Sequence, residues 1–306
     1  MRILVHGAGA VGSYFGALLA RAGNDTVLVA RGEHLEALQR RGLRVERPDG
    51  PLAAPTLRAV ATPRDAFPEA APDLVLVCVK SYDTAAAAAA LAPVVAPETI
   101  VLSLQNGIEN EESLAARLGL PPLLVGLTRI GVERTGPGVV RYTGRGEILF
   151  GEPGGRLSPR ARRLGETLAG AGIPHQLRRD VLVVAWEKLA WNAGFNAVTT
   201  LVDQPVGPVV ARAETCALVR RAMEETDAVA AALGIAVRRR RLDAVLAESA
   251  SEMPDFPTSM LQDRRRGTRL EHDALNGAVV RAGERAGVAV PVNRLLLGLL
   301  AGLSVG

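Results

Sequence analysis

Near its start the chain reads RILVHGAGAVG (residues 2–12), in which an apolar run leads directly into the pattern G-x-G-x-x-G. A stretch with helical character, residues 13–22, follows. Strand, glycine-rich turn and helix in this order are the context in which the pattern predicts dinucleotide binding. We expect the first glycine to allow a tight turn, the second to admit a pyrophosphate, and the third to let the helix pack on the strand. The predicted cofactor-binding loop is Gly7, Ala8, Gly9, Ala10, Val11 and Gly12.

The end of the second predicted strand, residues 26–30, indicates which dinucleotide binds. An NAD site usually has an Asp or Glu about 20 residues after the first glycines, where it binds the ribose 2′-OH. This chain has Arg31 at that place. Because a guanidinium suits a 2′-phosphate and a carboxylate repels one, we predict NADP(H) as the cofactor.

Length and composition limit the kind of protein. The 306 residues suffice for two domains, and 48% hydrophobic residues supply their cores. The net charge of +4 fits a pocket for anionic ligands, but no basic-aromatic pattern indicates nucleic acid. Cys78 and Cys216 form no C-x-x-C pattern, so neither a disulfide framework nor a metal site is predicted. With no signal pattern and no apolar run long enough to span a bilayer, we expect a cytoplasmic protein.

The order of apolar and helical segments predicts an α/β fold. The clearest strands are residues 2–6, 26–30, 74–79, 100–104 and 123–127. An alanine tract at 85–90 predicts a crossover helix, and residues 139–142 and 148–150 predict a hairpin around Gly144-Arg145-Gly146. Strands of this kind, separated by helices, predict a Rossmann-like, doubly wound parallel sheet.

Helical periodicity replaces this alternation after about residue 180. Helices are expected at residues 181–200, 213–233, 242–250 and 269–286, with an exposed arginine turn at 238–241. We therefore predict an NADP-binding Rossmann-like domain over residues 1–177 and a mostly helical, substrate-binding domain over 178–306.

Two predicted strands end in polar residues. Lys80 follows one strand, and Asn106, within Gln105-Asn106-Gly107, follows the next. Ligands of open α/β sheets bind outside the carboxyl ends of strands, so both residues are candidates for contact with cofactor or substrate. The alternative is an ordinary turn at the strand end, where Asn-Gly is common.

A polar line runs along the apolar helix expected after residue 180. Lys188, Asn192 and Asn196 are spaced i, i+4 and i+8, which places them on one helix face. A lysine in a dry site has a lowered pKa and can donate a proton near neutral pH, and the amides could bind a carboxylate or hydroxyl. The alternative is a polar stripe that is merely satisfied against the other domain.

Residues 256–277 form a third cluster, which is weak when taken alone. Ser259 could simply cap a helix, Glu271 could be a solvated helix residue, and His272 has no second histidine at metal-binding spacing.

The ordered set of motifs resembles the ketopantoate reductase (2-dehydropantoate 2-reductase) family across essentially the whole chain. The motifs are GAGAVGS at 7–13, VAR at 29–31, VK at 79–80, QNG at 105–107, K-x-x-x-N-x-x-x-N at 188–196, PTSM-x-x-D at 257–263 and E-x-D-x-x-N-G at 271–277. Only the first is common among unrelated enzymes.

The resemblance implies NADPH-dependent reduction of ketopantoate to pantoate, in pantothenate and coenzyme A biosynthesis. It implies that Lys188 is the general acid and that Glu271 contacts the cofactor or positions the reacting groups. The other implied roles are substrate binding by Asn192, Asn196 and Ser259, and NADPH binding by Arg31, Lys80 and Asn106.

Departures from the family pattern leave the substrate open. Some members have Asn-Pro where this chain has Asn196-Ala197, and some have a further asparagine where Val206 stands. The alternatives are therefore reduction of another branched 2-keto acid, or an NADP-binding sensor without turnover. The expected partner is a small 2-keto acid rather than nucleic acid or membrane, and whether the chain forms a homodimer is open.

Overall fold

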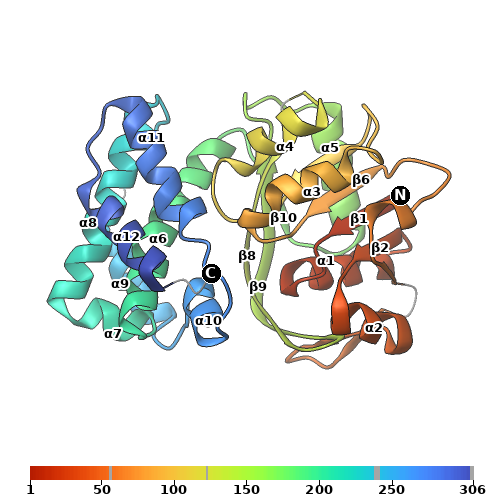
Figure 1. Ribbon diagram of the computed structural model, residues 1–306, viewed down its shortest axis with the longest axis horizontal. Coiled ribbons are helices and arrows are strands. Elements are labelled where there is room, and N and C mark those ends of the chain that lie inside the picture. Colours follow the sequence, from red (N-terminus) through yellow and green to blue (C-terminus); the bar gives the residue numbers. More distant parts are fainter. Residues whose placement is uncertain (55–56, 122, 238–241, 304–306) are drawn as a thin grey trace. The chain divides into compact units, whose positions relative to one another are not determined.

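The computed structural model describes residues 1–54, 57–121, 123–237 and 242–303, so the arginine turn expected at 238–241 lies outside it. The chain packs into two compact units (Figure 1). The first contains residues 1–105 and 110–181, and the second contains residues 106–109 and 182–306. The functional domain limits expected from the sequence, 1–177 and 178–306, stay a prediction.

A five-stranded parallel sheet forms the centre of the first unit. Its strands are β1 (Arg2–His6), β2 (Asp25–Val29), β5 (Arg58–Val60), β6 (Leu74–Val77) and β7 (Ile100–Ser103). They lie in the order β5-β2-β1-β6-β7, so the order reverses between β1 and β6. This confirms the predicted doubly wound sheet and places its binding edge at the carboxyl ends of β1 and β6.

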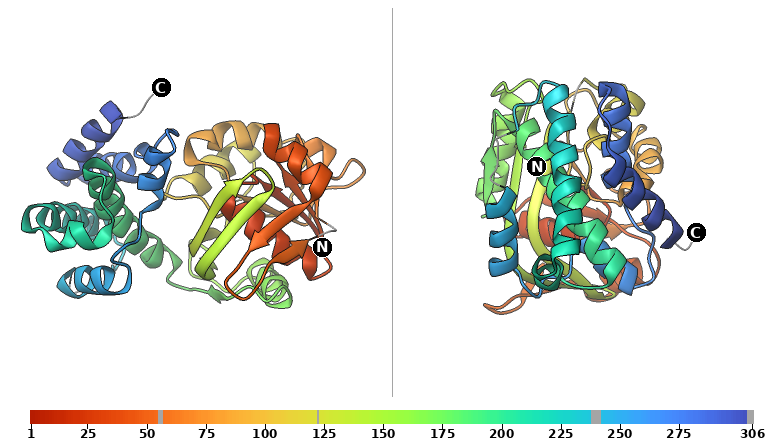
Figure 2. Two further views of the ribbon diagram at one scale, coloured as in Figure 1. Left: turned by 90° about the horizontal axis from the view of Figure 1, so that it is seen from below. Right: turned by 90° about the vertical axis from the view of Figure 1, so that its left-hand side faces the viewer.

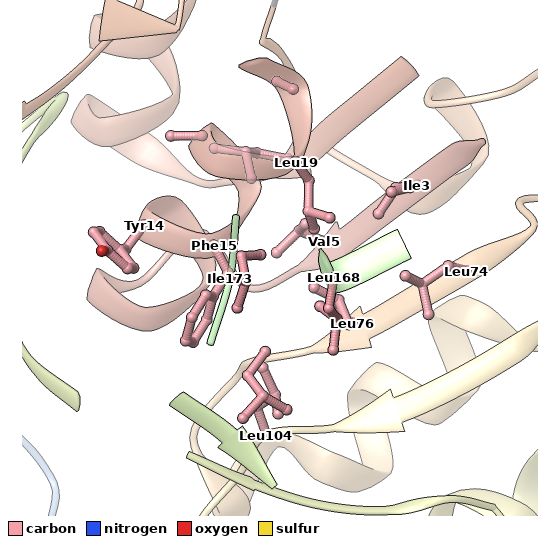
Figure 3. Close-up of a cluster of buried hydrophobic side chains, with 14 of the residues drawn as sticks. Ile3, Val5, Tyr14, Phe15, Leu19, Leu74, Leu76, Leu104, Leu168 and Ile173 are labelled. Carbon is pink, nitrogen blue, oxygen red and sulfur yellow. The ribbon is translucent and has the colours of Figure 1, made fainter. Parts of the chain in front are cut away.

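Helices cover both faces of this sheet because alternate residues of each strand enter different cores. Ile3 and Val5 pack with α1 (Ala10–Arg21) and α5 (Pro159–Gly170), in the core drawn in Figure 3. Leu4 packs on the other side with α3 (Thr84–Leu91) and α4 (Asn110–Leu118). Helix α2 (Gly32–Arg41) follows β2, and α3 confirms the helix expected at the alanine tract.

A second sheet corrects two predictions from the sequence. The segments expected to form a hairpin around residues 144–146 instead form one strand, β9 (Val139–Gly151), paired with β8 (Val125–Gly136) in a long two-stranded ribbon (Figure 2, left). Gly144, at φ +140°, is accommodated by a register shift within the ribbon, and the chain reverses before Val139. The strand expected at 123–127 is therefore the start of β8, with a single parallel bridge from Leu124 to Leu102 of β7.

The remaining strands of this sheet are short. They are β3 (Leu43–Glu46), β4 (Leu52–Ala54) and β10 (His175–Leu177), in the order β10-β9-β3-β4. The alternation of apolar and polar residues in these strands is too brief to predict them from the sequence.

The second unit is helical, as predicted. Its helices are α6 (Val181–Val202), α7 (Val206–Ala211), α8 (Ala213–Ala232), α9 (Leu242–Glu252), α10 (Ser259–Arg265), α11 (Ala278–Ala286) and α12 (Pro291–Leu303). The helix expected at 269–286 is wrong in its first part, because Leu270 and Glu271 are buried outside any helix and a π-helical turn, Asp273–Gly277, precedes α11. Within the described ranges, no helix is long and apolar enough to cross a membrane.

Candidate active site

The predicted phosphate loop joins β1 to α1 with the geometry that the glycines require. Gly7 has φ +107°, and a Cβ on it would lie 2.6 Å from the backbone nitrogen of Val79. A Cβ on Gly12 would lie 2.2 Å from the carbonyl oxygen of Gly7. At Gly9, by contrast, a Cβ would meet nothing within 4 Å. The backbone of the loop therefore borders open space at the start of α1, where a pyrophosphate can approach free N–H groups.

Arg31 and Lys80 follow two strands at this same edge of the sheet. Arg31 is the exposed N-cap residue of α2, directly after β2. Lys80 is half-buried after β6, and its carbonyl oxygen accepts a hydrogen bond from Nε2 of Gln105 at 3.5 Å. Their places agree with the expectation that polar residues gather at the carboxyl ends of the strands.

A pocket of about 390 Å³ lies beside Arg31 in the first unit. It is lined by Arg31, Glu33 and His34 of α2 and its cap, and by Arg134, Thr135, Gly136 and Pro137 at the tip of the β8–β9 ribbon. Neither Arg31 nor Arg134 forms an ion pair with another described residue. The pocket thus presents two uncompensated guanidinium groups against one carboxylate, which favours an anion.

His34, which lines this pocket, is a buried residue. Its Nδ1 accepts a hydrogen bond from the backbone nitrogen of Gly138 at 2.9 Å, which requires a neutral ring. Burial lowers the pKa of His34, in agreement with that neutral form. Its Nε2 is buried and has no hydrogen-bond partner among the described residues.

Three predicted residues come together in the second unit. Nζ of Lys188, on α6, donates to Oδ1 of Asn106 at 3.1 Å. Nδ2 of Asn106 donates in turn to Oε2 of Glu271 at 3.4 Å. Glu271 is 6% exposed, just before the π-helical turn. The amide of Asn106 thus links the lysine ammonium to the buried carboxylate, with each of its polar atoms toward the group of opposite charge.

The two asparagines of the polar line on α6 are buried, whereas Lys188 is half-buried. Asn192 is 6% exposed, and Asn196 is 1% exposed with neither amide atom hydrogen-bonded in the described part of the chain. Thr200, one further turn along, also has a buried hydroxyl without a partner there. Leaving a buried amide unsatisfied costs about 1–3 kcal/mol, so Asn196 marks a place where a ligand group could bind.

Ser259 lies at the start of α10 and is exposed. The cap of this helix is Thr258, whose hydroxyl accepts a hydrogen bond from the backbone nitrogen of Leu261 at 3.4 Å. The alternative that Ser259 serves as the helix cap is therefore wrong. Its hydroxyl remains accessible for other contacts.

Sequence reasoning missed several charged residues around these groups, namely Arg134, Glu109 and Arg281. No local pattern distinguishes them, because arginine is abundant everywhere in this chain. A signal was present for the lysines, however. Only two of the 36 basic residues are lysines, Lys80 and Lys188. Arginine holds its proton at neutral pH, whereas lysine can release one. Lysine at these two positions of an arginine-rich chain therefore indicates a function that arginine cannot perform.

A doubly wound sheet with a glycine-rich phosphate loop, together with a lysine linked through an amide to a buried carboxylate, defines a class of protein. These features place the chain among the oxidoreductases that use a pyridine nucleotide.

Comparison with known proteins narrows the class. Residues 3–155 match the family described as Ketopantoate reductase PanE/ApbA, and residues 180–304 match its C-terminal part. The chain is 38% identical to the 2-dehydropantoate 2-reductase of Halobacterium salinarum, over 98% of each chain. A PanE/ApbA family ketopantoate reductase from Ralstonia eutropha is 36% identical, with a TM-score of 0.91 over 99% of this chain and 98% of that one. The protein belongs to the ketopantoate reductase family.

The fold is also similar to that of a more distant enzyme. A D-mandelate dehydrogenase, solved with NADH and anilino(oxo)acetate, is 25% identical with a TM-score of 0.89, over 99% of this chain and 98% of that one.

Proposed function

We propose that the protein reduces 2-dehydropantoate to pantoate with NADPH, the step that supplies pantoate for pantothenate and coenzyme A. The observation that carries this proposal is the Lys188–Asn106–Glu271 chain of hydrogen bonds, at 3.1 and 3.4 Å. The family membership supports the substrate. In this proposal residues 1–177 bind the cofactor and residues 178–306 bind the keto acid.

The residues at the sheet edge fit a pyridine dinucleotide. The open space over Gly9 leaves room for a pyrophosphate on the N–H groups that begin α1. Arg31, Lys80 and the rest of the loop, Gly7 to Gly12, would hold the phosphates and riboses. When bound, the reduced nicotinamide supplies the hydride for the keto carbon.

The choice of NADP(H) over NAD(H) rests on the pocket beside Arg31. A ribose 2′-phosphate carries two negative charges that a 2′-hydroxyl lacks, and Arg31 and Arg134 offer two cations to it. Glu33 also lines this pocket and opposes the effect in part. The net balance still favours the phosphate, since two guanidinium groups face one carboxylate.

The chemical role of the second unit is proton donation and substrate binding. Lys188 donates a proton from Nζ to the substrate oxygen as the keto carbon is reduced, so that C=O becomes CH–OH and the lysine is left as a neutral amine. Asn106 holds the ammonium in place through Oδ1, and Glu271 holds the amide through its other end. Positioning of this kind makes proton transfer effective without further rearrangement.

The substrate would be held by uncharged groups of the same unit. Asn192 and Asn196 lie one and two turns from Lys188 on α6, and the unsatisfied amide of Asn196 gains partners from a carboxylate or hydroxyl of the ligand. Ser259, with its accessible hydroxyl, completes the proposed set.

A second candidate substrate is favoured by the likeness to D-mandelate dehydrogenase, at 25% identity. The same residues would then reduce another 2-keto acid, branched or aromatic, by the same proton transfer. A non-catalytic NADP sensor is less well supported, because a sensor needs no lysine held on an amide and a carboxylate.

The deciding experiment follows oxidation of NADPH by its absorbance, with 2-dehydropantoate beside a panel of branched and aromatic 2-keto acids, and repeats each assay with NADH. Turnover that is fastest with 2-dehydropantoate and NADPH is the expected result. Preference for another keto acid would keep the mechanism and change the substrate. Binding of NADPH with no turnover on any acid would favour the sensor instead.

A further inference from the structure

Asn106 begins a four-residue excursion of the chain, residues 106–109, out of the first compact unit. Residues 106–109 pack with the second unit, whereas Gln105 and Asn110 on either side belong to the first. Thr84 contacts both of these flanks. Its hydroxyl accepts from Nε2 of Gln105 at 2.8 Å, and its one proton is shared between Oδ1 of Asn110 at 2.9 Å and the carbonyl oxygen of Ser81 at 2.7 Å. Hydrogen bonds to Thr84 thus hold the residues on both sides of the excursion. The contacts made by residues 106–109 then determine where the Asn106 amide lies.

The excursion is held in the second unit by an arginine of α11. Nη2 of Arg281 donates to Oε2 of Glu109 at 2.7 Å, and its Nε donates to the same carboxylate at 3.1 and 3.3 Å. Arg285 adds a longer contact, at 3.6 Å from Oε1 of Glu109. The hydrogen bonds that Arg281 donates to Glu109 raise the pKa of Arg281 above its ordinary value. A two-pronged arginine–carboxylate contact sets orientation as well as distance.

The same guanidinium also holds the turn that follows Glu271. Nη1 of Arg281 donates to Oδ1 of Asp273 at 2.7 Å, and Nη2 donates to the carbonyl oxygen of Asp273 at 3.0 Å. Gly277 makes room for this pair, since a Cβ there would lie 2.7 Å from Oδ1 of Asp273 and 3.1 Å from Nη1 of Arg281. The π-helical turn Asp273–Gly277 therefore closes around the ion pair, two residues after Glu271.

Arg281 thus contacts two segments, the loop that carries Asn106 and the turn that follows Glu271. Asn106 and Glu271 are themselves joined by the hydrogen bond of 3.4 Å. We propose that Arg281 is a positioning residue. By forming ion pairs with both Glu109 and Asp273, it holds Asn106 between Lys188 and Glu271. The inference rests on the proposed function of Lys188 as proton donor. It assigns a role to Glu109, Asp273 and Gly277 through their contacts with Arg281.

The test compares Arg281→Met and Arg281→Lys with a matched control on the same unit. The control is Arg294→Met, which removes a fully peripheral ion pair, Nη2 of Arg294 to Oε1 of Glu284 at 2.7 Å, both side chains 58% exposed. We expect Arg281→Met to lower kcat on the order of tenfold or more, as small displacements of reacting groups do, and to raise the Kd for NADPH by a smaller factor, because Asn106 is also an expected cofactor contact. Arg281→Lys should recover part of the loss, and Arg294→Met should match the wild type.

A second variant makes the coupling specific. Glu109→Gln should lower kcat as well. In the double variant with Arg281→Met, the fold-loss of kcat should be much smaller than the product of the two single fold-losses, because both substitutions remove the same Arg281–Glu109 contact. Independent losses that multiply would overturn the proposal. So would a wild-type kcat in Arg281→Met, or an equal loss in Arg294→Met.

A structural readout separates this inference from the proposed function. The side-chain amide signal of Asn106, identified by its disappearance in Asn106→Asp, should shift in the NMR spectrum of Arg281→Met and stay in place in Arg294→Met. An unchanged signal overturns the positioning role even if the wild type proves inactive on every keto acid. An inactive wild type with the expected shift would overturn the proposed function alone.

Discussion

Lys188 is the residue on which the proposed chemistry depends most, because its Nζ combines a transferable proton with a position fixed by a hydrogen bond. Its ammonium is held by Oδ1 of Asn106 at 3.1 Å, and that amide is held by Glu271. An arginine at the same place would keep the charge and lose the ability to release a proton at neutral pH.

Replacing Lys188 tests this role directly. Lys188→Ala should lower turnover at least about a hundredfold, the usual scale for loss of a general acid, while NADPH still binds. Lys188→Arg serves as the charge-preserving control and should also be slow. Steady-state kinetics with titration of NADPH fluorescence measures both quantities. Near-normal turnover in either variant would contradict the assignment.

Arg31 and Arg134 test cofactor choice at the same scale. Each replacement by Ala should weaken NADPH binding by about tenfold or more and leave NADH binding nearly unchanged, since each removes a charge-assisted contact to the 2′-phosphate alone. Arg129, on the same ribbon but paired with Glu147 at 3.7 Å, offers a control. Equal losses for both cofactors in the Arg31 and Arg134 variants would refute the assignment of the pocket.

At the scale of elements, the loop between β1 and α1 contains glycines for two different reasons, close packing within the fold and space for a ligand. Gly12 is required by the fold, because its Cβ would overlap the carbonyl oxygen of Gly7 at 2.2 Å. Gly9 has no such neighbour within 4 Å, so only a ligand would meet a side chain there. The pattern in the sequence therefore contains two glycines that the fold requires, Gly7 and Gly12, and one, Gly9, that we assign to ligand binding.

Two alanine variants distinguish these two reasons. Gly9→Ala should keep the thermal stability of the wild type and weaken dinucleotide binding by about tenfold or more, because the added methyl group displaces the pyrophosphate. Gly12→Ala should lower the free energy of unfolding by about 2–4 kcal/mol through steric overlap. Thermal unfolding and cofactor titration measure the two effects. Normal cofactor affinity in Gly9→Ala would contradict the placement of the phosphates.

Elements also show where prediction from the sequence succeeds. The strands at 2–6, 26–30, 74–79 and 100–104 were recovered to within two residues, because near-continuous apolar runs have few alternatives in a buried sheet. The ribbon β8–β9 was not predicted, because the local sequence around Gly144 is typical of a turn. Only pairing with β8 keeps this residue in a strand. The π-helical turn before α11 was missed for a related reason, since its shape depends on Arg281 and Asp273.

At the scale of the whole molecule, His6 links the stability of the fold to pH. It ends β1, is 3% exposed, and neither ring nitrogen has a partner among the described residues. Burial, and secondarily the charge of Arg31, lowers the pKa of His6 to about 4 from 6.5. His6 is therefore protonated below about pH 6.5 in the unfolded chain, but only below about pH 4 in the folded chain.

The sign of this effect is a loss of stability on acidification. Above pH 6.5 the ring is neutral in both states, and as the pH falls to about 4 the free energy of unfolding should drop by about 3 kcal/mol on account of His6. His6→Leu should remove this part of the drop and leave that of the carboxylates. Urea unfolding of both proteins between pH 7.5 and 4.5 gives the difference. Parallel curves would contradict the buried, neutral state of His6.

The sequence by itself determined the parallel sheet, the glycine loop, the basic residue after β2 and the polar line on α6. Each is written in a short stretch of chain, because strand and helix periodicity and turn chemistry act between near neighbours. Only the tertiary structure decided that Asn106 meets Lys188, 82 residues away, and Glu271, 165 residues away. It alone also placed Arg134 beside Arg31 and Arg281 on Glu109. Contacts of this kind arise when whole elements pack, and no local pattern states which distant charge will be the partner.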